Sequence, residues 1–234
     1  RRHTRYPLVT GVQTCALPIF TNVVHRDVPQ WRGSSPWVEK PEEFLACDDW
    51  WFRPVDLTMG PDGGLYIADF YNCIIGHYEV DLKHPRRDRT RGRIWRVVWM
   101  GAGPAATPPD VAGLSHEKLV ALLDGPTESL RRLAFDQLVA RGRVDPAVAT
   151  AIRAASLGEQ GRARSLRALG LLGLLDDATI SAAANDSSRL VRVHLLTAVA
   201  DLPEAARTHG RLFRERLADA DPFVRRAAAE ACVA

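Results

Sequence analysis

The sequence predicts a mixed, multi-domain fold in which a partial β-propeller, about one blade plus a flanking strand, precedes an α-solenoid of paired helices. Two observations lead to this expectation. Before residue 100, short stretches with a two-residue apolar period are separated by glycine-rich turns, and all six tryptophans of the 234 residues lie in this part. After residue 115, alanine, leucine and arginine recur at helical spacing, and the pattern repeats itself roughly every thirty residues.

Residues 1–19 are expected to be an artefact rather than native protein. The string VTGVQTCALPI at residues 9–19 is the translation of a common sequencing-library adaptor, and residues 1–5 match the translation of its other arm. The alternative is a secretory signal peptide with a basic start and a short apolar stretch. Three polar residues and a glycine interrupt that stretch, which makes the alternative less favourable. Native sequence is therefore expected to begin near Phe20.

The charge of the chain indicates no polyanionic partner. The formal net charge is +3, and Arg1, Arg2 and Arg5 supply all of this excess, because the first 19 residues contain no acidic side chain. A basic run at residues 83–91 holds five Lys or Arg residues but no aromatic side chain that could stack on a base. We interpret this run as a solvated loop whose arginines pair with carboxylates such as Asp81, and we expect no nucleic-acid binding.

The cysteines predict neither a disulfide framework nor a haem site. Cys47, Cys73 and Cys232 form no CxxC pair and no CxxCH haem-attachment motif. We interpret them as small buried hydrophobic residues, although Cys47 and Cys73 could approach each other on neighbouring elements. No apolar run comes close to the roughly 18–20 residues that a membrane-spanning helix needs, so no transmembrane segment is expected.

Residues 20–100 have the pattern of one blade at the C-terminal end of a propeller. Val55, Leu57 and Met59 alternate with polar residues, as in a half-buried strand, and a dense glycine–proline turn follows at residues 60–64. One blade cannot close a propeller, so the chain is expected to be a fragment of a longer protein. The expected strands are residues 55–59, 65–68, 74–80 and 93–99.

The remainder of the chain is expected to be a linker at residues 101–113, rich in proline, glycine and alanine, and a helical part at residues 114–234. An apolar residue followed by arginine begins at positions 130, 163, 191 and 224, with intervals of 33, 28 and 33 residues. A period in this range indicates a solenoid of two-helix units. The last helix reaches Ala234 without a polar cap, so the stack is expected to be truncated there. The expected helices are residues 117–123, 128–140, 147–156, 162–172, 179–184, 189–200, 209–217 and 222 onward.

The helical part resembles HEAT repeats and related α-solenoids. The resemblance rests on the D-x-x-V-R-x-x-A pattern at residues 221–228 and on the start signals Asp145-Pro146 and Asp221-Pro222, where a capping carboxylate precedes a proline. It implies paired helices that approach closely where their contact residues are small. Those small residues are Ala134, Ala168, Ala198 and Ala228.

The first part resembles a particular family of large secreted proteins from planctomycetes and verrucomicrobia. The string WFRPVDLTMGPDGGLYIADFYNCIIGHYEV at residues 51–80, followed by RGRIWRV at residues 91–97, carries the resemblance. That family combines a dehydrogenase-like propeller, called the membrane-bound dehydrogenase domain, with HEAT-like repeats and commonly a cytochrome c domain. The resemblance implies a periplasmic or secreted protein whose cofactors would be pyrroloquinoline quinone with calcium, and haem c in a domain outside this chain.

Five polar residues are candidates for binding a cofactor or substrate at the mouth of such a propeller: Arg53, Asp69, Tyr71, His77 and Arg91. An arginine in this place can hold an anionic cofactor or a sugar acid through two parallel hydrogen bonds. The alternative, which we favour for Asp69, is a structural role in which the carboxylate binds backbone amides or an arginine and holds the following loop. No catalytic residue is assigned, and no metal site is expected because the histidines lack metal-ligand spacing.

Two functions from different classes follow. The first is a propeller dehydrogenase that oxidises a sugar or alcohol and passes electrons to a cytochrome domain, with the HEAT-like part as a docking or spacer module that binds a protein partner. The second is a non-catalytic scaffold that binds carbohydrate or protein. In either case this chain alone is expected to show no turnover, because the chemistry would need several converging blades.

Overall fold

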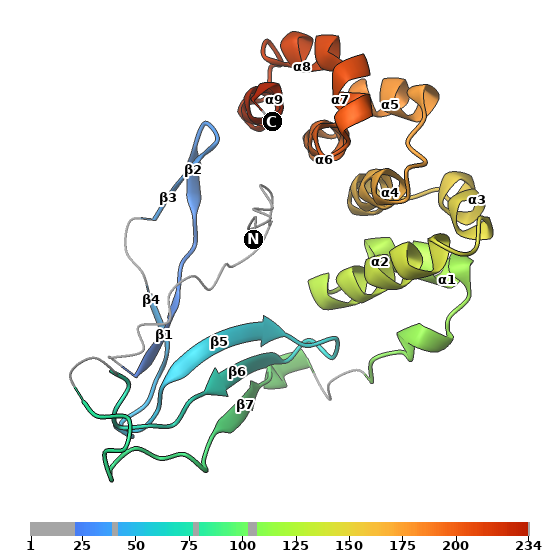
Figure 1. Ribbon diagram of the computed structural model, residues 1–234. Coiled ribbons are helices and arrows are strands. Elements are labelled where there is room, and N and C mark those ends of the chain that lie inside the picture. Colours follow the sequence, from blue (N-terminus) through green and yellow to red (C-terminus); the bar gives the residue numbers. More distant parts are fainter. Residues whose placement is uncertain (1–21, 39–41, 77–79, 103–106, 234) are drawn as a thin grey trace. The chain divides into compact units, whose positions relative to one another are not determined.

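The structure is a computed structural model that describes residues 22–38, 42–76, 80–102 and 107–233. The described residues fall into two compact units that divide between Pro108 and Pro109. We call them the sheet unit and the helical unit and describe each by itself. Small antiparallel sheets make up the first, and helices make up the second, so the fold is mixed as expected (Figure 1). The sheets formed by the described residues do not close into a propeller.

Three antiparallel sheets form the sheet unit. β5 (Pro54–Met59), β6 (Leu65–Asp69) and β7 (Arg93–Val97) form a three-stranded meander. Its first hairpin closes as the sequence predicts, with the Gly60 amide donating to the Gly64 carbonyl at 2.7 Å and Gly63 in the left-handed region at φ 78°. Two further pairs precede it along the chain. They are β1 (Val23–Arg26) with β4 (Glu42–Ala46), and β2 (Gln30–Arg32) with β3 (Ser35–Trp37).

The expected strand at residues 74–80 is wrong for the residues that the structure describes. Residues 74–76 and 80 lie in a loop, and residues 77–79 fall outside the described ranges. The Arg87 guanidinium explains this difference, because it donates to the carbonyls of Ile74, Val80 and Asp81 at 3.5, 2.7 and 3.0 Å, and also to the carbonyl of Gly76. These carbonyls are satisfied by one side chain rather than by a strand ladder, so the sheet has three strands instead of four.

A small core supports one face of the meander. Val24 from β1, Phe52 and Ile67 from β6 are fully or nearly fully buried, and partly buried side chains on β4, β5 and β7 pack around them. β1 and β4 therefore lie against the meander. Pairing places Pro54, Asp69 and Arg93 side by side, so β5 begins, β6 ends and β7 begins at the same end of the sheet.

The helical unit consists of helix pairs with a continuous core. Most helices begin and end within a few residues of the expected positions, because their starts carry capping side chains such as Ser115, Thr127, Asp176, Ser188 and Asp221. The helices are α1 (His116–Ala121), α2 (Glu128–Gly142), α3 (Ala147–Ala154), α4 (Glu159–Leu171), α5 (Asp177–Ala184), α6 (Arg189–Ala200), α7 (Pro203–Thr208), α8 (Gly210–Arg216) and α9 (Pro222–Cys232), with short 3-10 turns η2 (Val111–Gly113) and η3 (Leu122–Asp124). A further 3-10 turn, η1 (Met100–Ala102), belongs to the sheet unit.

Two details of this unit differ from the expectation. The helix expected at residues 209–217 is preceded by a separate helix, α7, which begins with Pro203 at its first turn. Residues 111–113, placed in the linker by the sequence, form η2, and Val111 is buried in the same core as α1 and α2. The Arg141 side chain fixes this segment by donating to the carbonyls of Leu114 and Ala112, both at 2.6 Å.

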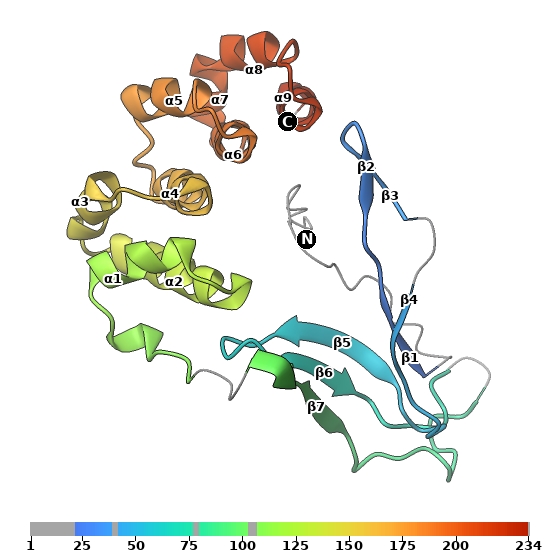
Figure 2. The same cartoon turned by 180° about the vertical axis from the view of Figure 1, so that it is seen from behind.

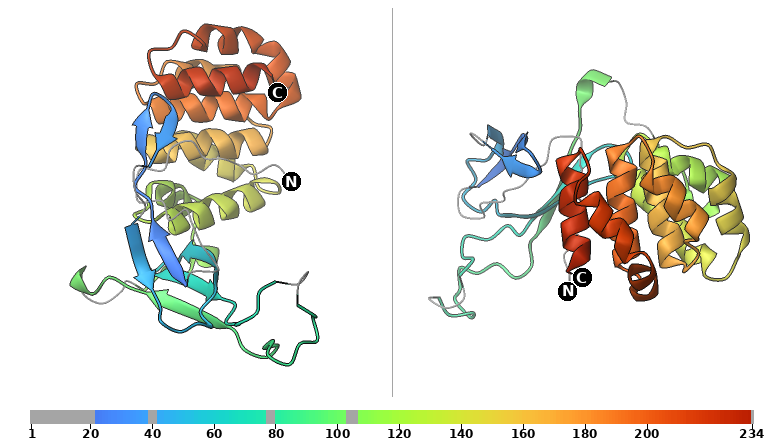
Figure 3. Two further views of the ribbon diagram at one scale, coloured as in Figure 1. Left: turned by 90° about the vertical axis from the view of Figure 1, so that its left-hand side faces the viewer. Right: turned by 90° about the horizontal axis from the view of Figure 1, so that it is seen from above.

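The second helix of each pair packs against its counterpart in the next pair. α2 contacts α4, α4 contacts α6 and α6 contacts α9, and Figures 1 and 2 show these four helices side by side along one side of the unit. The layered stack is seen from another direction in Figure 3. We call α2, α4, α6 and α9 the inner helices. The small residues at which the sequence predicts close approach, one on each inner helix, are all buried: Ala134, Ala168, Ala198 and Ala228. None of the helices in the described ranges combines the length and the apolar character that a membrane-crossing segment requires.

Candidate functional site

Asp69 is the centre of a polar cluster at the end of the meander. Its Oδ1 atom accepts hydrogen bonds from the backbone amides of Arg53 and Tyr71, both at 2.8 Å, and its Oδ2 atom accepts from Trp95 Nε1 at 3.1 Å. The side chain is almost fully buried. These contacts agree with the structural alternative, in which Asp69 ties the start of β5 to the loop after β6, and they leave it poorly suited to ligating a metal ion.

Arg53 lies beside Asp69 but points its guanidinium elsewhere. Nη1 donates to the Phe52 carbonyl at 2.9 Å and to the Asn22 side-chain oxygen. Only 7% of the residue is exposed, and Nε is buried without a hydrogen-bond partner. No carboxylate in the described parts of the chain forms an ion pair with this arginine. Asn22 is itself held in the left-handed region, at φ 58°, and donates to the Asp49 carbonyl at 3.3 Å.

Tyr71 belongs to a stack of aromatic and cationic side chains. It is one of two described non-glycine residues in the left-handed region, with φ 46°. The Arg93 guanidinium lies 3.4 Å from the centre of its ring, and the Trp51 ring lies 5.5 Å from it at a tilted angle. Arg93 also approaches Trp95, at 5.6 Å, and Asp49, at 3.7 Å. The cluster is thus closed by Asp49, which contacts both Asn22 and Arg93.

The remaining sequence candidates do not join this cluster in the described residues. Arg91 is exposed and pairs with Asp88 at 3.0 Å. The Asp88 carboxylate also accepts from the amides of Thr90 and Arg91, and the Thr90 amide is the main reason that the pKa of Asp88 lies below its ordinary value. His77 lies outside the described residues. The basic run is thus a loop, as expected, but Arg87 and Arg89 bind backbone carbonyls rather than carboxylates.

The described residues do not fit calcium or haem. They contain no group of three or more His, Cys, Asp or Glu side chains arranged to hold a metal ion. The described cysteines Cys47, Cys73 and Cys232 are all free, and Cys232 is exposed, which corrects the expectation that it is buried. The polar cluster at this end of the meander thus consists of Asp69, Arg53 and the Tyr71–Arg93 stack, and the described residues add no group of metal ligands to it.

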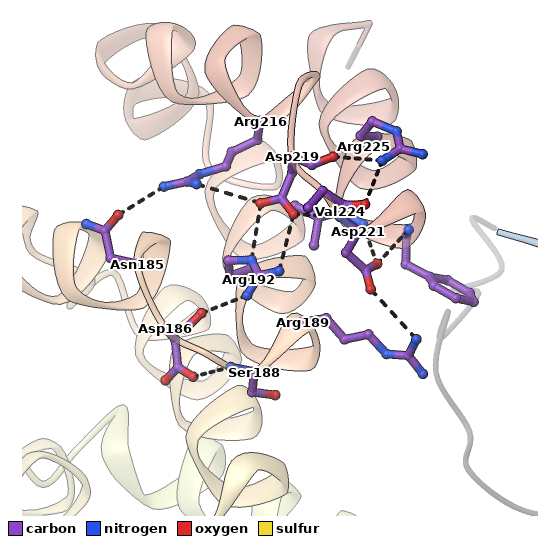
Figure 4. A network of polar contacts seen from close by, with 12 residues as sticks. Asn185, Asp186, Ser188, Arg189, Arg192, Arg216, Asp219, Asp221, Val224 and Arg225 are labelled. Atoms are coloured by element: carbon purple, nitrogen blue, oxygen red, sulfur yellow. Dashed lines mark hydrogen bonds and ion pairs between the residues drawn. The ribbon is translucent and has the colours of Figure 1, made fainter. Parts of the chain in front are cut away.

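The helical unit carries a second polar network, which joins successive layers. In Figure 4, Arg192 on α6 donates from Nε and Nη2 to the two carboxylate oxygens of Asp219, both at 3.2 Å, while Nη1 donates to the Asp186 carbonyl at 2.8 Å. One layer earlier, Arg162 binds the two oxygens of Asp186 at 2.9 and 3.0 Å and the Leu157 carbonyl at 3.0 Å. Each arginine therefore holds the carboxylate of the following layer side-on.

Both carboxylates of this network have a lowered pKa. Burial raises the pKa of Asp186, but hydrogen bonds from Arg162 and the Ser188 amide outweigh burial and hold it below the ordinary value. For Asp219, burial likewise raises the pKa, and the Asp221 amide and Arg192 reverse the effect. The hydrogen bonds around Asp186 and Asp219 thus stabilise the ionised carboxylates.

The geometry of these arginines changes the repeat phase inferred from the sequence. Arg131, Arg162, Arg192 and Arg225 each donate from Nη1 to a carbonyl five or six residues earlier, so they occupy equivalent places. The second repeat therefore aligns on Gly161-Arg162, and not on the pair that begins at residue 163. The position before the arginine holds an apolar side chain in the other repeats but a glycine, Gly161, in this one. The reason is that the Gly161 amide donates to Asp124 at 2.6 Å, and a side chain at residue 161 would collide with that carboxylate.

A third set of polar residues lies on the inner helices, and we call it the inner row. Arg164 on α4 pairs with Glu128 on α2 at 2.6 Å, and Arg167 on α4 pairs with Asp201, just after α6, at 2.5 Å. His194 on α6 is mostly buried beside them, and burial together with the positive charges of the two arginines lowers its pKa to about 4. At neutral pH the imidazole is thus uncharged.

Sequence reasoning missed several of these residues. The roles of Asn22, Arg93 and Trp95 depend on contacts between segments far apart in the chain, for which no short motif exists. Asp186 and Asp219 did carry a signal, because each lies six residues before an arginine of the repeat. This spacing points to the two loops but not to the phase of the second repeat, because Ser156 is the residue six positions before Arg162.

Comparison with known proteins gives one match. Residues 13–100 match the model of a domain of unknown function, DUF7133. The match covers the described sheet unit as far as Met100, and it begins within the segment that the sequence analysis assigns to an adaptor. No curated protein and no solved structure matches the chain. The comparisons therefore show only that residues 13–100 are similar to DUF7133, and they lend no support to a dehydrogenase or electron-transfer role.

Proposed function

We propose that the helical unit is a HEAT-like α-solenoid that serves as a docking or spacer module for a protein partner. The observation that carries this proposal is the repeated clamp, in which Arg162 holds Asp186 and Arg192 holds Asp219 with the same atoms. Identical joints between layers make a regular stack, and stacks of this kind offer extended surfaces for binding other proteins.

The inner row is the surface that we assign to the partner. Its arginines are already fixed by Glu128 and Asp201, so a partner would meet charges in set positions and lose little side-chain entropy in ordering them. Fixed charges of both signs favour selection by electrostatic complementarity more than raw affinity. The described residues supply neither a metal cluster nor an unpaired acid on these helices that would favour catalysis instead.

A matched pair of variants tests this assignment. The variant Arg164→Ala/Arg167→Ala removes two ion-paired arginines from α4, and Arg207→Ala/Arg211→Ala removes two ion-paired arginines from α7 and α8. Each full-length chain is immobilised, and the proteins that it retains from an extract of the source cells are identified by mass spectrometry. We expect the wild type and the α7/α8 variant to retain the same protein and the α4 variant to lose it. Equal retention by all three, or retention of nothing, would contradict the proposal.

A second proposal concerns the sheet unit, and it is supported by the sequence resemblance alone. In it, the meander belongs to the propeller of a periplasmic or secreted dehydrogenase that acts on a sugar or alcohol, with pyrroloquinoline quinone and calcium and a haem c domain elsewhere in that protein. The alternative is a scaffold that binds carbohydrate without redox chemistry. Assay of the chain with sugars and alcohols and an artificial electron acceptor is expected to give no turnover. Measurable turnover would mean that this chain holds a complete site, contrary to both versions.

A further inference from the structure

Arg53 differs from Arg162 and Arg192, the two arginines that clamp successive layers of the helical unit. In Arg162 and Arg192, Nη1 binds a main-chain carbonyl, and the edge formed by Nε and Nη2 binds both oxygens of one carboxylate. In Arg53, Nη1 likewise binds a main-chain carbonyl, that of Phe52, at 2.9 Å, with Asn22 as a second acceptor. The Nε–Nη2 edge of Arg53, however, has no partner among the described residues.

This arrangement is unfavourable unless an anion completes it. A guanidinium keeps its proton at every accessible pH, so it cannot become neutral when it is buried. Only 7% of Arg53 is exposed, and its Nε is shielded from water as well as unpaired. An unpaired buried charge, or a buried donor without an acceptor, costs free energy that the surrounding contacts must offset. The same chain avoids this cost at Arg162 and Arg192 by supplying a carboxylate.

The neighbouring acid cannot fill this role. Asp69 uses Oδ1 for the backbone amides of Arg53 and Tyr71 and Oδ2 for the Trp95 indole, so both of its oxygens already accept hydrogen bonds. Its contact with Arg53 is to the main chain and not to the guanidinium. Asn22 and the Phe52 carbonyl meanwhile fix Nη1, which sets the direction of the opposite edge. The Nε–Nη2 edge of Arg53 is thus held in a fixed direction, and no acceptor among the described residues binds it.

We propose that the Nε–Nη2 edge of Arg53 is a binding site for the carboxylate of a small organic acid. Two parallel N–H donors match the two oxygens of a carboxylate, and Arg162 and Arg192 show this same pairing within the protein. Because Nε is buried and only 7% of Arg53 is exposed, the pair forms in a largely water-free place, where a charge-assisted hydrogen bond is stronger than at an exposed position. This site is independent of the docking role of the helical unit.

The test is a titration of the full chain observed at the arginine side chains by NMR. The probes are sodium acetate and sodium glucuronate, with glucose as the neutral counterpart of glucuronate and sodium phosphate as a different oxyanion, all at constant ionic strength. We expect the Nε–Hε signal of Arg53, assigned by its loss in Arg53→Lys, to shift and saturate with both carboxylates and to remain unchanged with glucose. No saturable shift, or saturation by phosphate in preference to both carboxylates, would overturn the proposal.

Two variants separate this site from its surroundings. Arg53→Lys keeps the charge but loses the fork, and we expect affinity for glucuronate to fall by about tenfold or more. Arg96→Lys is the matched control, since Arg96 lies on β7 of the same sheet and pairs with Asp62 at 2.6 Å, and we expect it to bind glucuronate as the wild type does. Undiminished binding by Arg53→Lys would contradict the proposal. If that variant fails to fold, the wild-type titration decides the question alone, and the signal is then assigned through the arginine side-chain connectivity.

Discussion

The clamp arginines of the helical unit and Arg53 of the sheet unit differ in how their donors are satisfied. In the helical unit, Arg162 and Arg192 are saturated, because each holds a carboxylate on one edge and a carbonyl on the other. In the sheet unit, Arg53 is more deeply buried and yet leaves one edge empty, while Arg93 lies on a tyrosine ring. The two clamps therefore satisfy the charges of their arginines, whereas the Nε–Nη2 edge of Arg53 has no acceptor among the described residues.

This difference bears on how each unit could act. Saturated clamps stiffen a stack and fix its surface, which suits a docking module. A preorganised arginine with an unpaired donor is typical of a binding site. The free energy that the unpaired donor costs in the free protein is recovered when a ligand binds to it. Tyr71 points the same way, since a tyrosine in the left-handed region is strained, and strain of this kind concentrates at functional sites.

We expect the largest effect on stability from removing the carboxylate that Arg192 binds in the helical unit. Asp219→Ala leaves Arg192 and Arg216 without their shared acid, and only 6% of the Asp219 side chain is exposed. We expect the free energy of unfolding to fall by about 3 kcal/mol, because an uncompensated, partly buried charge remains. Urea unfolding followed by helical circular dichroism measures it. Glu215→Ala, which breaks the exposed pair with Arg211, is the control and should cost about 0.5 kcal/mol or less.

Lowering the pH sharpens the same comparison, because the pKa of His194 is displaced far from its ordinary value. Its pKa falls from 6.5 to about 4 in the folded protein through burial and through Arg164 and Arg167, with Glu128 acting weakly against them. The unfolded chain therefore takes up a proton that the folded chain refuses, and stability decreases as the pH falls from 6.5 toward 4. We expect a loss of about 2 kcal/mol between pH 7.5 and pH 5.

Unfolding curves at the two pH values test this expectation, with His194→Gln as the control. The variant keeps a polar side chain of similar size but does not titrate, so its stability should change much less over the same range. Asp186 and Asp219 do not confuse the result, because their lowered pKa values place their loss of stability at a more acidic pH. An equal pH slope in the variant and the wild type would contradict the assignment.

In the sheet unit, the matching experiment is Asp69→Asn. The amide oxygen can still accept from the Arg53 and Tyr71 amides, but the amide nitrogen then faces the Trp95 indole, so two donors oppose each other. We expect a loss of about 1.5 kcal/mol. Tryptophan fluorescence reports it selectively, since all six tryptophans lie at or before Trp99. Asp56→Asn, at an exposed position on β5, should leave the fluorescence transition unchanged.

The helical unit could be predicted closely because its signals are local. Ser115, Thr127 and Asp221 cap helices that begin within one residue of them, and the buried alanines follow the helical period. The separate helix α7 escaped attention although Pro203 marks its start. The error in repeat phase arose because an apolar–Arg pair recurs by chance at residue 163, whereas the carbonyl and carboxylate partners that define equivalence are not encoded next to the arginine.

The sheet unit was predicted less completely because its contacts are not local. The hairpin of β5 and β6 follows from alternation and a glycine turn, and it is present. The expected strand at residues 74–80 failed because Arg87, several residues later, captures its carbonyls. The contacts of Asp69 with backbone amides agree with its structural interpretation, but the bond from Trp95 crosses 26 residues and depends on strand register. The unpaired Nε–Nη2 edge of Arg53 could not be predicted, because the sequence does not show which side chains a buried arginine contacts.

We expect the smallest effect on stability from substitutions at two glycines of the inner helix α4. An added side chain at Gly170 would meet the Ala198 Cβ atom at 3.6 Å, an ordinary contact, whereas at Gly161 it would lie 2.6 Å from the Asp124 carboxylate. Gly170→Ala should therefore stabilise the protein by about 0.5 kcal/mol by favouring helix over the flexible unfolded chain. Gly161→Ala should destabilise it, because Asp124 must release the start of α4. Urea midpoints of the two variants measured side by side test this, and a gain from both would mean that Asp124 can move aside freely.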